Sequence, residues 1–289
     1  MPNAFGWGTK NDEVVDAFAD RVKGRVFLVT GPAPNGLGDA ALRALARAHP
    51  AALLLVGRSP AKYAPVIDAI KAIDPAIVVR VYGVDFNVLQ TVRGGAGKIL
   101  EENERIDVVI NSAGVMRADL KYTVDGIEEH FQTCHVGHFL LTNLLMPLLK
   151  KSDEPRVVNV SSGAYRVGTG DYSDYNFKNQ DFVWFKGYGQ AKLANLHFSK
   201  ALAARGVTSY ALHPGVIHGT SLGPEFPPEI LEQLRKGDSS KGMDLKEKSG
   251  GWLEDCQLVT PIGEGASKAG APEELWKLSE KLVGQEFTF

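Results

Sequence analysis

Cysteine is scarce in this chain of 289 residues, which holds only Cys134 and Cys256. Two distant thiols give no disulfide framework, so we expect a reducing, cytoplasmic location rather than a secreted one. A long apolar run is also missing, because residues 139–149 are interrupted by polar residues and fall short of the roughly 20 residues that cross a bilayer. Residues 1–13 lack the apolar segment of a signal peptide. We therefore expect neither an integral membrane segment nor a secretory leader.

An excess of charge of either sign is missing as well. The sequence has 32 Lys and Arg against 34 Asp and Glu, a formal net charge of −2. A protein that coats nucleic acid carries a basic excess, so nucleic-acid binding is not expected. The hydrophobic share of 44% and the charged share of 23% are those of a globular protein with a large core. The composition therefore excludes a chain that is disordered throughout.

Short apolar runs rich in β-branched residues alternate with segments in which apolar residues return every three or four positions. The runs predict strands of a parallel sheet covered on both faces, and the periodic segments predict helices. The expected strands are residues 25–30, 52–56, 77–83, 106–111, 156–161 and 207–212. The expected helices are residues 37–49, 60–73, 88–103, 125–150, 188–204 and 272–282. Successive βαβ units with right-handed crossovers give the α/β class, as a Rossmann-like doubly wound parallel sheet with helices on both faces.

No linker rich in glycine or serine divides the chain, so we expect one domain over residues 1–289. Residues 1–22 would form an N-terminal extension. Residues 219–251 combine prolines with a polar stretch and would form a lid over the substrate.

A glycine-rich turn follows the first expected strand and opens the next helix. In a βαβ fold this arrangement directs backbone N–H groups and a helix N-terminus at the pyrophosphate of a dinucleotide. A plain turn that uses glycine for its positive φ is the alternative, but the place in the first βα connection favours the cofactor interpretation. The residues concerned are Gly31, Asn35, Gly36, Leu37 and Gly38.

Arg58 follows the second strand, about twenty residues after Gly38, where an enzyme specific for NAD usually carries an acidic residue. Its guanidinium suits the 2′-phosphate of NADP, and a solvated surface arginine is the alternative. Asp85 follows the third strand at the edge where adenine would lie, and it could equally cap the next helix. We therefore expect NADP, as NADPH, to be the cofactor.

Tyr188 and Lys192 are four residues apart in an expected helix, so their side chains share one face. An ammonium beside a phenol favours the phenolate and lowers the tyrosine pKa toward the range of an acid–base catalyst. Ser161 and Ser162 end the fifth strand, where a hydroxyl can reach a substrate oxygen or can cap a turn. The group predicts general acid–base chemistry.

Two other patterns suggest different chemistry. Residues 219–223 match the G-x-S-x-G elbow of serine hydrolases with Ser221 as the nucleophile, but the prolines that follow oppose the helix that such an elbow requires. His130, Cys134 and His138 recur every four residues and could present a zinc-binding row. The sequence has no obvious further ligand cluster, and a helix packed on a sheet easily buries such a row. We expect no metal site.

Taken in order, five motifs resemble those of the short-chain dehydrogenase/reductase family, and of its retinol-dehydrogenase-like branch in particular, over residues 23–223 and the tail. The glycine turn, with four residues between Gly31 and Gly36, resembles that of a fungal-type member. The resemblance implies a homodimer or homotetramer formed through the fourth and fifth helices, for which residues 139–149 are sufficiently apolar. The motifs are NSAG at 111–114, the helix pattern at 131–149, VNVSS at 158–162, YGQAK at 188–192 and HPGVI at 213–217.

The resemblance also implies a role for each catalytic residue. Tyr188 would give a proton to the carbonyl oxygen during reduction, or remove it during oxidation. Lys192 would lower the Tyr188 pKa and hold the nicotinamide ribose. Ser162, which aligns with the serine of the family motif, would orient the substrate oxygen.

On the cofactor side, the resemblance places Asn111 and Ala113 along the adenosine, and Ile217 and Thr220 at the carboxamide and phosphates. The expected function is that of an NADP-dependent oxidoreductase. It would interconvert a hydroxyl and a ketone or aldehyde on a small apolar molecule, in a setting such as secondary metabolism.

Two departures from the family pattern keep a second interpretation open. Cys134 stands where the family has the asparagine of its catalytic tetrad, and a thiol is a weak hydrogen-bonding group. The segment 223–251 is shorter than in the branch, and residues 250–256 resemble the last strand. The alternative function is a cofactor-binding homologue with little or no catalytic activity.

Overall fold

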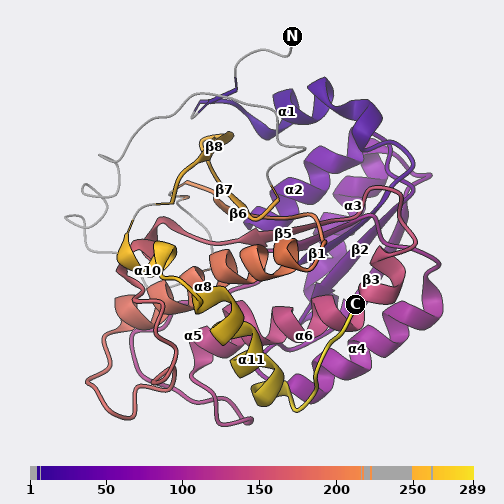
Figure 1. The fold of residues 1–289 in the computed structure, drawn as a ribbon. Coiled ribbons are helices and arrows are strands. Elements are labelled where there is room, and N and C mark those ends of the chain that lie inside the picture. The colour runs from indigo at the N-terminus through magenta and orange to yellow at the C-terminus, as the bar shows by residue number, and fades with distance from the viewer. Residues whose placement is uncertain (1–4, 7, 216, 218–221, 223–248, 262) are drawn as a thin grey trace.

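The structure, a computed structural model, describes residues 5–6, 8–215, 217, 222, 249–261 and 263–289. In this part of the chain, eight strands form one sheet in the order β3-β2-β1-β4-β5-β6-β7-β8 (Figure 1). Neighbouring strands are parallel except β8, which is antiparallel to β7. The strand order reverses between β1 and β4, which confirms the Rossmann-like α/β fold. The strands are β1 Val26–Thr30, β2 Ala52–Gly57, β3 Val78–Gly83, β4 Val108–Asn111, β5 Arg156–Val160, β6 Ser209–His213, β7 Gly251–Glu254 and β8 Gln257–Val259.

Helices cover both faces of the sheet (Figure 1). On one face α2 and α3 pack against β1 and β2. On the other face lie α4, α6 and α8, with α8 packed against β5 and β6 and α11 packed on α8. The α-helices are α1 Asn11–Ala17, α2 Leu37–Ala46, α3 Ala64–Ile73, α4 Leu89–Glu102, α5 Glu129–Phe131, α6 Gly137–Leu144, α7 Met146–Leu149, α8 Trp184–Ala204, α10 Glu264–Ser267 and α11 Ala271–Val283. The other helical segments are the 3₁₀ turns η1 Ala19–Arg21, η2 Pro60–Tyr63 and η4 Gly163–Val167, and the π-helical turn η3 Gln132–Val136.

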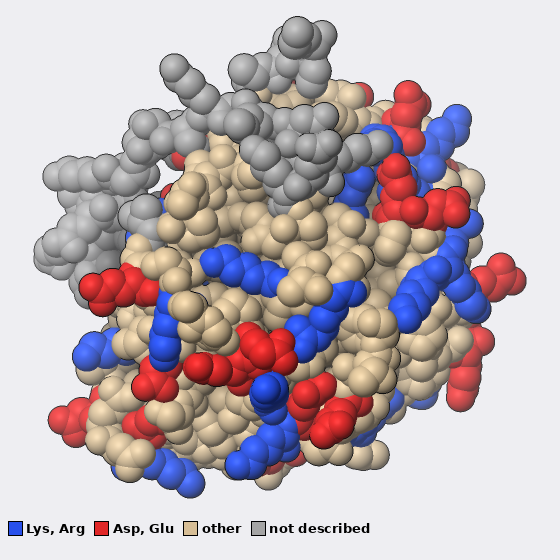
Figure 2. All heavy atoms as spheres, viewed as in Figure 1, with Lys and Arg blue, Asp and Glu red and all other residues tan. Residues whose placement is uncertain are grey.

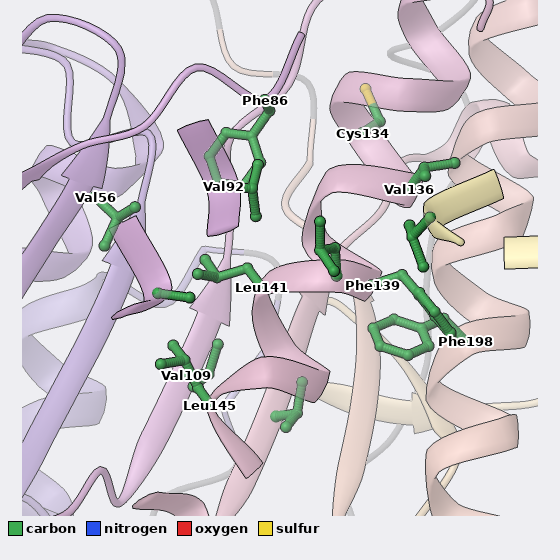
Figure 3. Close-up of a cluster of buried hydrophobic side chains, with 14 of the residues drawn as sticks. Val56, Phe86, Val92, Val109, Cys134, Val136, Phe139, Leu141, Leu145 and Phe198 are labelled. Atoms are coloured by element: carbon green, nitrogen blue, oxygen red, sulfur yellow. The ribbon is translucent and has the colours of Figure 1, made fainter. Parts of the chain in front are cut away.

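Both faces of the central strands are buried, which explains why their sequences are unbroken apolar runs. All six residues of β2 are buried. Leu54 and Val56 join the cluster on the side of α4 and α6, whereas Leu53 and Leu55 join the cluster on the side of α2 and α3. Figure 3 shows part of the first cluster, in which Val109 of β4 meets the side chains of α6. Each leucine that is fully buried in this way stabilises the fold by about 1.5–3 kcal/mol.

The single helix predicted over residues 125–150 is wrong, because the structure divides this segment into α5, η3, α6 and α7. Glu128 caps α5 by accepting the N–H groups of His130 and Phe131, so the helix begins at Glu129. Pro147 has no N–H to donate and lies in the first turn of α7, so the chain breaks after α6. Apolar residues return at the same spacing before and after these breaks, so the sequence pattern does not reveal where one helix ends and the next begins.

Elements at the two ends of the chain complete the fold. β7 lies within residues 250–256, as the resemblance to the last strand predicts, and β8 returns beside it. The two strands are joined by Asp255 and Cys256, which have φ values of 52° and 61°. Two such residues form the hairpin turn that matches the twist of its strands. The sequence did not predict β8 or α1.

The apolar residues 139–149 are covered by the C-terminal part of the same chain. The ring of Phe139 lies 4.9 Å from that of Trp276 in α11 and 5.7 Å from that of Phe287. Arg205 in turn lies 3.8 Å above the Trp276 ring. This surface, which the resemblance assigns to subunit contacts, is therefore buried within the chain, and the oligomeric state stays a prediction.

The surface in Figure 2 shows lysines and arginines interspersed with aspartates and glutamates rather than gathered in a stripe of one sign. Within the described ranges, no helix combines the length and the apolar character needed to cross a membrane.

Candidate cofactor site and active site

Loops after β1 and β4 meet at the point where the strand order reverses, which is where open α/β sheets bind their ligands. Gly31 follows β1, and a Cβ on it would lie 2.9 Å from the Cα of Ala113, which follows β4. Its φ of +71° also favours glycine. The structure thus brings Gly31 and Ala113 together, and only glycine permits this approach.

A hydrogen-bond chain beneath these loops runs from β1 to the π-helical turn η3. The Thr30 hydroxyl accepts the N–H groups of Ser112 and Ala113 at 2.8 and 2.9 Å and lies 2.9 Å from His138 Nε2. Its own proton is therefore donated to Nε2, which leaves the His138 proton on Nδ1 to donate to the Cys134 carbonyl at 3.1 Å. Burial lowers the pKa of His138 to about 3, so the ring is neutral. The chain ties the floor of the crevice to η3.

The glycine turn between Gly31 and Gly36 bends at Asn35. Its φ is 62°, in the left-handed region that asparagine tolerates better than most residues. Its N–H donates to Asp39 Oδ2 at 2.9 Å, and Asp39 pairs with Arg43 at 2.5 Å. The four-residue spacing therefore closes into an ordered turn.

The N-terminus of α2 opens at this turn without a cap. Gly36 occupies the N-cap position and no side chain of the described residues caps the helix. Leu37 and Gly38 follow, and a Cβ on Gly38 would overlap the carbonyl oxygen of Gly31. The unpaired N–H groups and the helix dipole suit a phosphate group. The predicted glycine-turn residues thus form one cradle that fits the pyrophosphate of a dinucleotide.

Arg58 is exposed directly after β2. The next residue, Ser59, donates its N–H to the Tyr63 hydroxyl at 3.2 Å. Burial raises the pKa of Tyr63, and the Ser59 N–H and the nearby Arg58 act in the opposite direction. Among the described residues, no carboxylate pairs with Arg58. Its guanidinium is therefore available to an anion at this end of β2.

Two predicted cofactor residues make contacts within the protein. Asp85 Oδ1 accepts the N–H of Asn87 at 3.0 Å in the turn before α4, whose N-cap residue is Val88, so the alternative interpretation of Asp85 as a helix cap is wrong. Asn111 is 1% exposed, and its Nδ2 donates to Thr142 at 3.0 Å and to Asn159 at 2.8 Å. The side chain of Asn111 therefore faces the interior, and only its backbone can contribute to the crevice.

The segment after β6 is described only in part. Ile217 is 49% exposed. Thr220 and the Ser221 of the hydrolase-like pattern lie outside the described residues, as does most of the lid at 219–251. Leu222 is described, and its carbonyl accepts the N–H of Met116 at 3.0 Å. This segment thus returns to the loop after β4.

The predicted catalytic residues meet at the carboxyl end of β5. Tyr188 and Lys192 lie one turn apart on α8, both buried, with Lys192 Nζ 5.5 Å from the centre of the tyrosine ring. Ser162, the second residue after β5, hydrogen-bonds to Tyr188. The Ser162 Oγ also accepts the N–H of Ala164 at 3.2 Å. Since that bond uses the Ser162 Oγ as an acceptor, the serine proton is directed at Tyr188, and it can be donated instead to a substrate oxygen that lies between the two hydroxyls.

Polar contacts fasten α8 to β5 at this position. The Val160 carbonyl accepts from Lys192 Nζ at 3.0 Å and from Asn195 Nδ2 at 3.1 Å. The Ser161 hydroxyl donates to the Lys192 carbonyl at 2.6 Å. Asn195 was missed in the sequence, although its place three residues after Lys192 puts the two side chains on one face.

The pKa of Tyr188 differs from the expectation. Burial raises it, and this effect outweighs the lowering by the Lys192 ammonium and by the hydrogen bond with Ser162. The prediction of a lowered pKa is thus wrong for the protein without cofactor, because desolvation disfavours the phenolate. At neutral pH Tyr188 is protonated, which is the state required of a proton donor.

Two glycines beside Tyr188 allow close packing that the sequence did not reveal. A Cβ on Gly189 would lie 2.6 Å from the carbonyl oxygen of Ala164, so the glycine lets η4 approach α8. A Cβ on Gly187 would lie 2.9 Å from the ring of Phe182. The first contact sets the separation of Ser162 from Tyr188, and the second brings an aromatic wall to the site.

Cys134 lies in η3 near Lys192, and Figure 3 shows it at one end of the core cluster. Its Sγ and Lys192 Nζ each lie 3.5 Å from the position that a Cβ on Gly114 would take. Burial raises the pKa of the thiol, so it is neutral at physiological pH. The thiol makes one long contact, 3.7 Å, to the Val115 carbonyl. Cys134 therefore gives the site little hydrogen-bonding capacity.

The row of His130, Cys134 and His138 is engaged in other contacts. His130 Nδ1 lies 2.5 Å from Glu128, and its Nε2 accepts the N–H of Arg117 at 2.8 Å. Both nitrogens of His138 are occupied by the chain from Thr30 to Cys134. No group of three possible ligands is placed to hold a metal ion in the described portion.

The doubly wound sheet, the phosphate cradle and the buried tyrosine–lysine pair define an oxidoreductase that acts on hydroxyl and carbonyl groups with a nicotinamide dinucleotide. Residues 25–229 match the family model described as short chain dehydrogenase, and the chain belongs to this family. The resemblance stated from the sequence motifs is thereby confirmed, whereas a fungal-type origin stays a prediction.

Individual relatives agree with this assignment. The chain is 35% identical to human retinol dehydrogenase 13 over 92% of its own length and 86% of the relative, and 34% identical to mouse retinol dehydrogenase 12 over 91% and 88%. Among solved structures, an uncharacterised protein from Mycobacterium paratuberculosis superimposes with a TM-score of 0.70 at 31% identity, over 92% of this chain and 96% of that one. Levodione reductase, at 22% identity and a TM-score of 0.54, shares the fold.

Proposed function

We propose that this chain is an NADP-dependent oxidoreductase that interconverts a hydroxyl and a ketone or aldehyde on a small apolar molecule. The observation that carries the proposal is the meeting of Ser162, Tyr188 and Lys192 beside the phosphate cradle, on elements fastened to one another. We further propose that residues 1–289 act as one domain in the cytoplasm. A role in secondary metabolism stays a prediction.

In the direction of reduction, Tyr188 acts as the general acid. Because burial raises its pKa, the phenol is protonated when the substrate arrives and can donate to the carbonyl oxygen. Ser162 donates to the same oxygen and orients it. The Lys192 ammonium stabilises the phenolate that results, and Tyr188 removes the proton from the alcohol when the reaction runs backward. This chemistry contributes about 10²- to 10⁴-fold to the rate.

The bound cofactor supplies or takes up the hydride at the carbon atom. We assign its pyrophosphate to the uncapped start of α2 and its ribose hydroxyls to Lys192. The 2′-phosphate is assigned to Arg58, because that guanidinium is exposed and no acidic residue ends β2. The remaining assigned residues are Gly31, Asn35, Gly36, Leu37, Gly38, Asp85, Asn111, Ala113, Tyr188, Ile217 and Thr220.

Apolar side chains near Tyr188 support an apolar substrate. The ring of His130 lies 6.1 Å from that of Tyr188 and stacks on Phe182 at 6.1 Å, and Phe177 packs against Phe182 at 5.1 Å. Two of the relatives are named retinol dehydrogenases. We therefore propose an alcohol or aldehyde on an apolar skeleton, with retinal as the first substrate to test.

Fluorescence titration with NADPH and with NADH tests the cofactor assignment. We expect tighter binding of NADPH, and we expect Arg58→Asp to weaken NADPH binding by about 10- to 100-fold, the worth of a charged hydrogen bond of about 1.5–3 kcal/mol. NADH affinity should change little. Arg21→Asp, at another exposed arginine, is the control. Equal affinity of the wild type for both dinucleotides would overturn the NADP assignment. Consumption of NADPH with retinal tests the reaction itself.

A further inference from the structure

The peptide that follows Ser162 is held by side chains to which the proposed chemistry gives no role. The Gly163 N–H donates to His213 Nδ1 at 3.1 Å, and its carbonyl accepts from Arg166 at 3.4 Å. Arg166 pairs with Glu254 of β7 at 3.0 Å. Because Ser162 is the N-cap of η4, the Gly163 N–H has no partner within that turn. His213 therefore satisfies a donor that would otherwise be unpaired.

This hydrogen bond specifies the protonation state of His213. Accepting an N–H requires a lone pair on Nδ1, so the ring is neutral and carries its proton on Nε2. Burial lowers the pKa of His213, Glu254 of β7 raises it, and Arg166 of η4 lowers it. Glu254 and Arg166 are the charged groups of the described residues that act on the ring. Protonation of Nδ1 would place an N–H of the ring against the N–H of Gly163, and two donors cannot form this hydrogen bond.

The position of Gly163 determines where the Ser162 hydroxyl lies. The Oγ of Ser162 is bound to the N–H of Ala164, so the serine moves with the turn. The 3₁₀ turn η4 packs on α8 at Gly189, next to Tyr188. A displacement of Gly163 therefore changes the distance between the Ser162 hydroxyl and the Tyr188 hydroxyl.

We propose that neutral His213 is a positioning residue: it holds η4 so that the hydroxyls of Ser162 and Tyr188 can both hydrogen-bond to one substrate oxygen. Protonation of His213 then releases this turn and slows the reaction. The inference rests on the proposed function of the site. His213 itself touches no reacting atom.

Kinetics with NADPH and retinal between about pH 5 and 9 test the proposal in three variants. His213→Leu removes the acceptor and should lower kcat by about 10- to 100-fold, since small misplacements of catalytic groups have effects of this size. NADPH affinity should stay within about twofold, which also shows that the variant is folded. His213→Asn keeps an acceptor without a titrating ring, so it should recover most of the lost rate and lose the fall in kcat at acid pH. His49→Leu, at a histidine whose side chain is 63% exposed, is the matched control.

Hydrogen exchange of a peptide covering residues 162–167 gives a readout that does not depend on turnover. We expect faster exchange than in the wild type for His213→Leu, and wild-type protection for His213→Asn. Equal protection in the wild type and His213→Leu, or wild-type kcat in His213→Leu, would overturn the proposal. A fall in kcat at acid pH that persists in His213→Asn would also overturn the proposal. Failure of the proposed function gives a different result, in which the exchange pattern stands but retinal is not reduced.

Discussion

The hydroxyl of Ser161 donates a hydrogen bond to the backbone carbonyl of Lys192 at 2.6 Å. It joins the end of β5 to the middle of α8, and Ser161 is 2% exposed. Successive side chains of an extended segment point to opposite sides, so the neighbouring Ser162 is directed elsewhere and meets Tyr188. The two adjacent serines therefore make different contacts: Ser161 fastens the helix, and Ser162 hydrogen-bonds to Tyr188.

Gly189→Ala should lower kcat by about tenfold or more with little change in the KM for NADPH. The added Cβ would lie 2.6 Å from the Ala164 carbonyl, so η4 would have to move away from α8 and carry Ser162 with it. Steady-state kinetics with NADPH and retinal measure the effect. Gly97→Ala in α4, where a Cβ meets no atom within 4 Å, is the control. It should keep kcat and raise the free energy of unfolding by about 0.5–1 kcal/mol. An unchanged kcat in Gly189→Ala would contradict the packing account.

Cys134→Asn should raise kcat. The thiol is neutral because burial raises its pKa, and it makes only the long contact to Val115. An amide at this position would bring a full donor and acceptor close to Lys192, which supports the proton transfer that restores Tyr188. Cys256→Asn is the matched control, because that residue is exposed and its φ of 61° suits asparagine. A lower or equal kcat in Cys134→Asn would show that the thiol is not what limits turnover.

Asp107→Asn should destabilise the protein by about 1–3 kcal/mol at neutral pH. Burial raises the pKa of Asp107, but the bonds from Ser152, from the Val26 N–H and from Arg105 outweigh it and hold the pKa below its usual value. A carboxylate with a lowered pKa stabilises the fold above about pH 4, and this stability is lost as the pH falls through the folded-state pKa.

Urea unfolding at neutral pH and near pH 3 measures the Asp107 effect, and the difference between wild type and variant should shrink in acid. Asp153→Asn, at an exposed loop position, is the control and should change the free energy of unfolding by less than about 0.5 kcal/mol. A difference that is the same at both pH values would exclude a role for the ionised carboxylate.

The parts of the fold that follow local rules could be predicted from the sequence. Unbroken apolar runs identified the central strands because parallel strands are buried on both faces. The glycine turn and the pair of Tyr188 and Lys192 were found because their spacing is a property of one turn or one helix face. These features need no knowledge of distant contacts.

The parts that were missed depend on contacts between distant segments. The bond from Gly163 to His213 joins η4 to β6 and has no signal in either segment. The raised pKa of Tyr188 follows from burial, which the i, i+4 lysine alone does not indicate. The cap by Glu128 was also missed. An acidic residue is favourable both as an N-cap and within the first turn of a helix, so its identity alone does not show where the helix begins.

Tyr188→Phe tests the central claim most directly, because it removes one hydroxyl from a ring that stays buried in the same packing. We expect NADPH affinity within a few-fold of the wild type and a rate of retinal reduction lower by at least about 10²-fold. Tyr122→Phe, which removes the hydroxyl that an exposed tyrosine donates to the Asn176 carbonyl, should keep the wild-type rate. Substantial turnover by Tyr188→Phe would contradict the assignment of Tyr188 as the acid, and with it the account of this site.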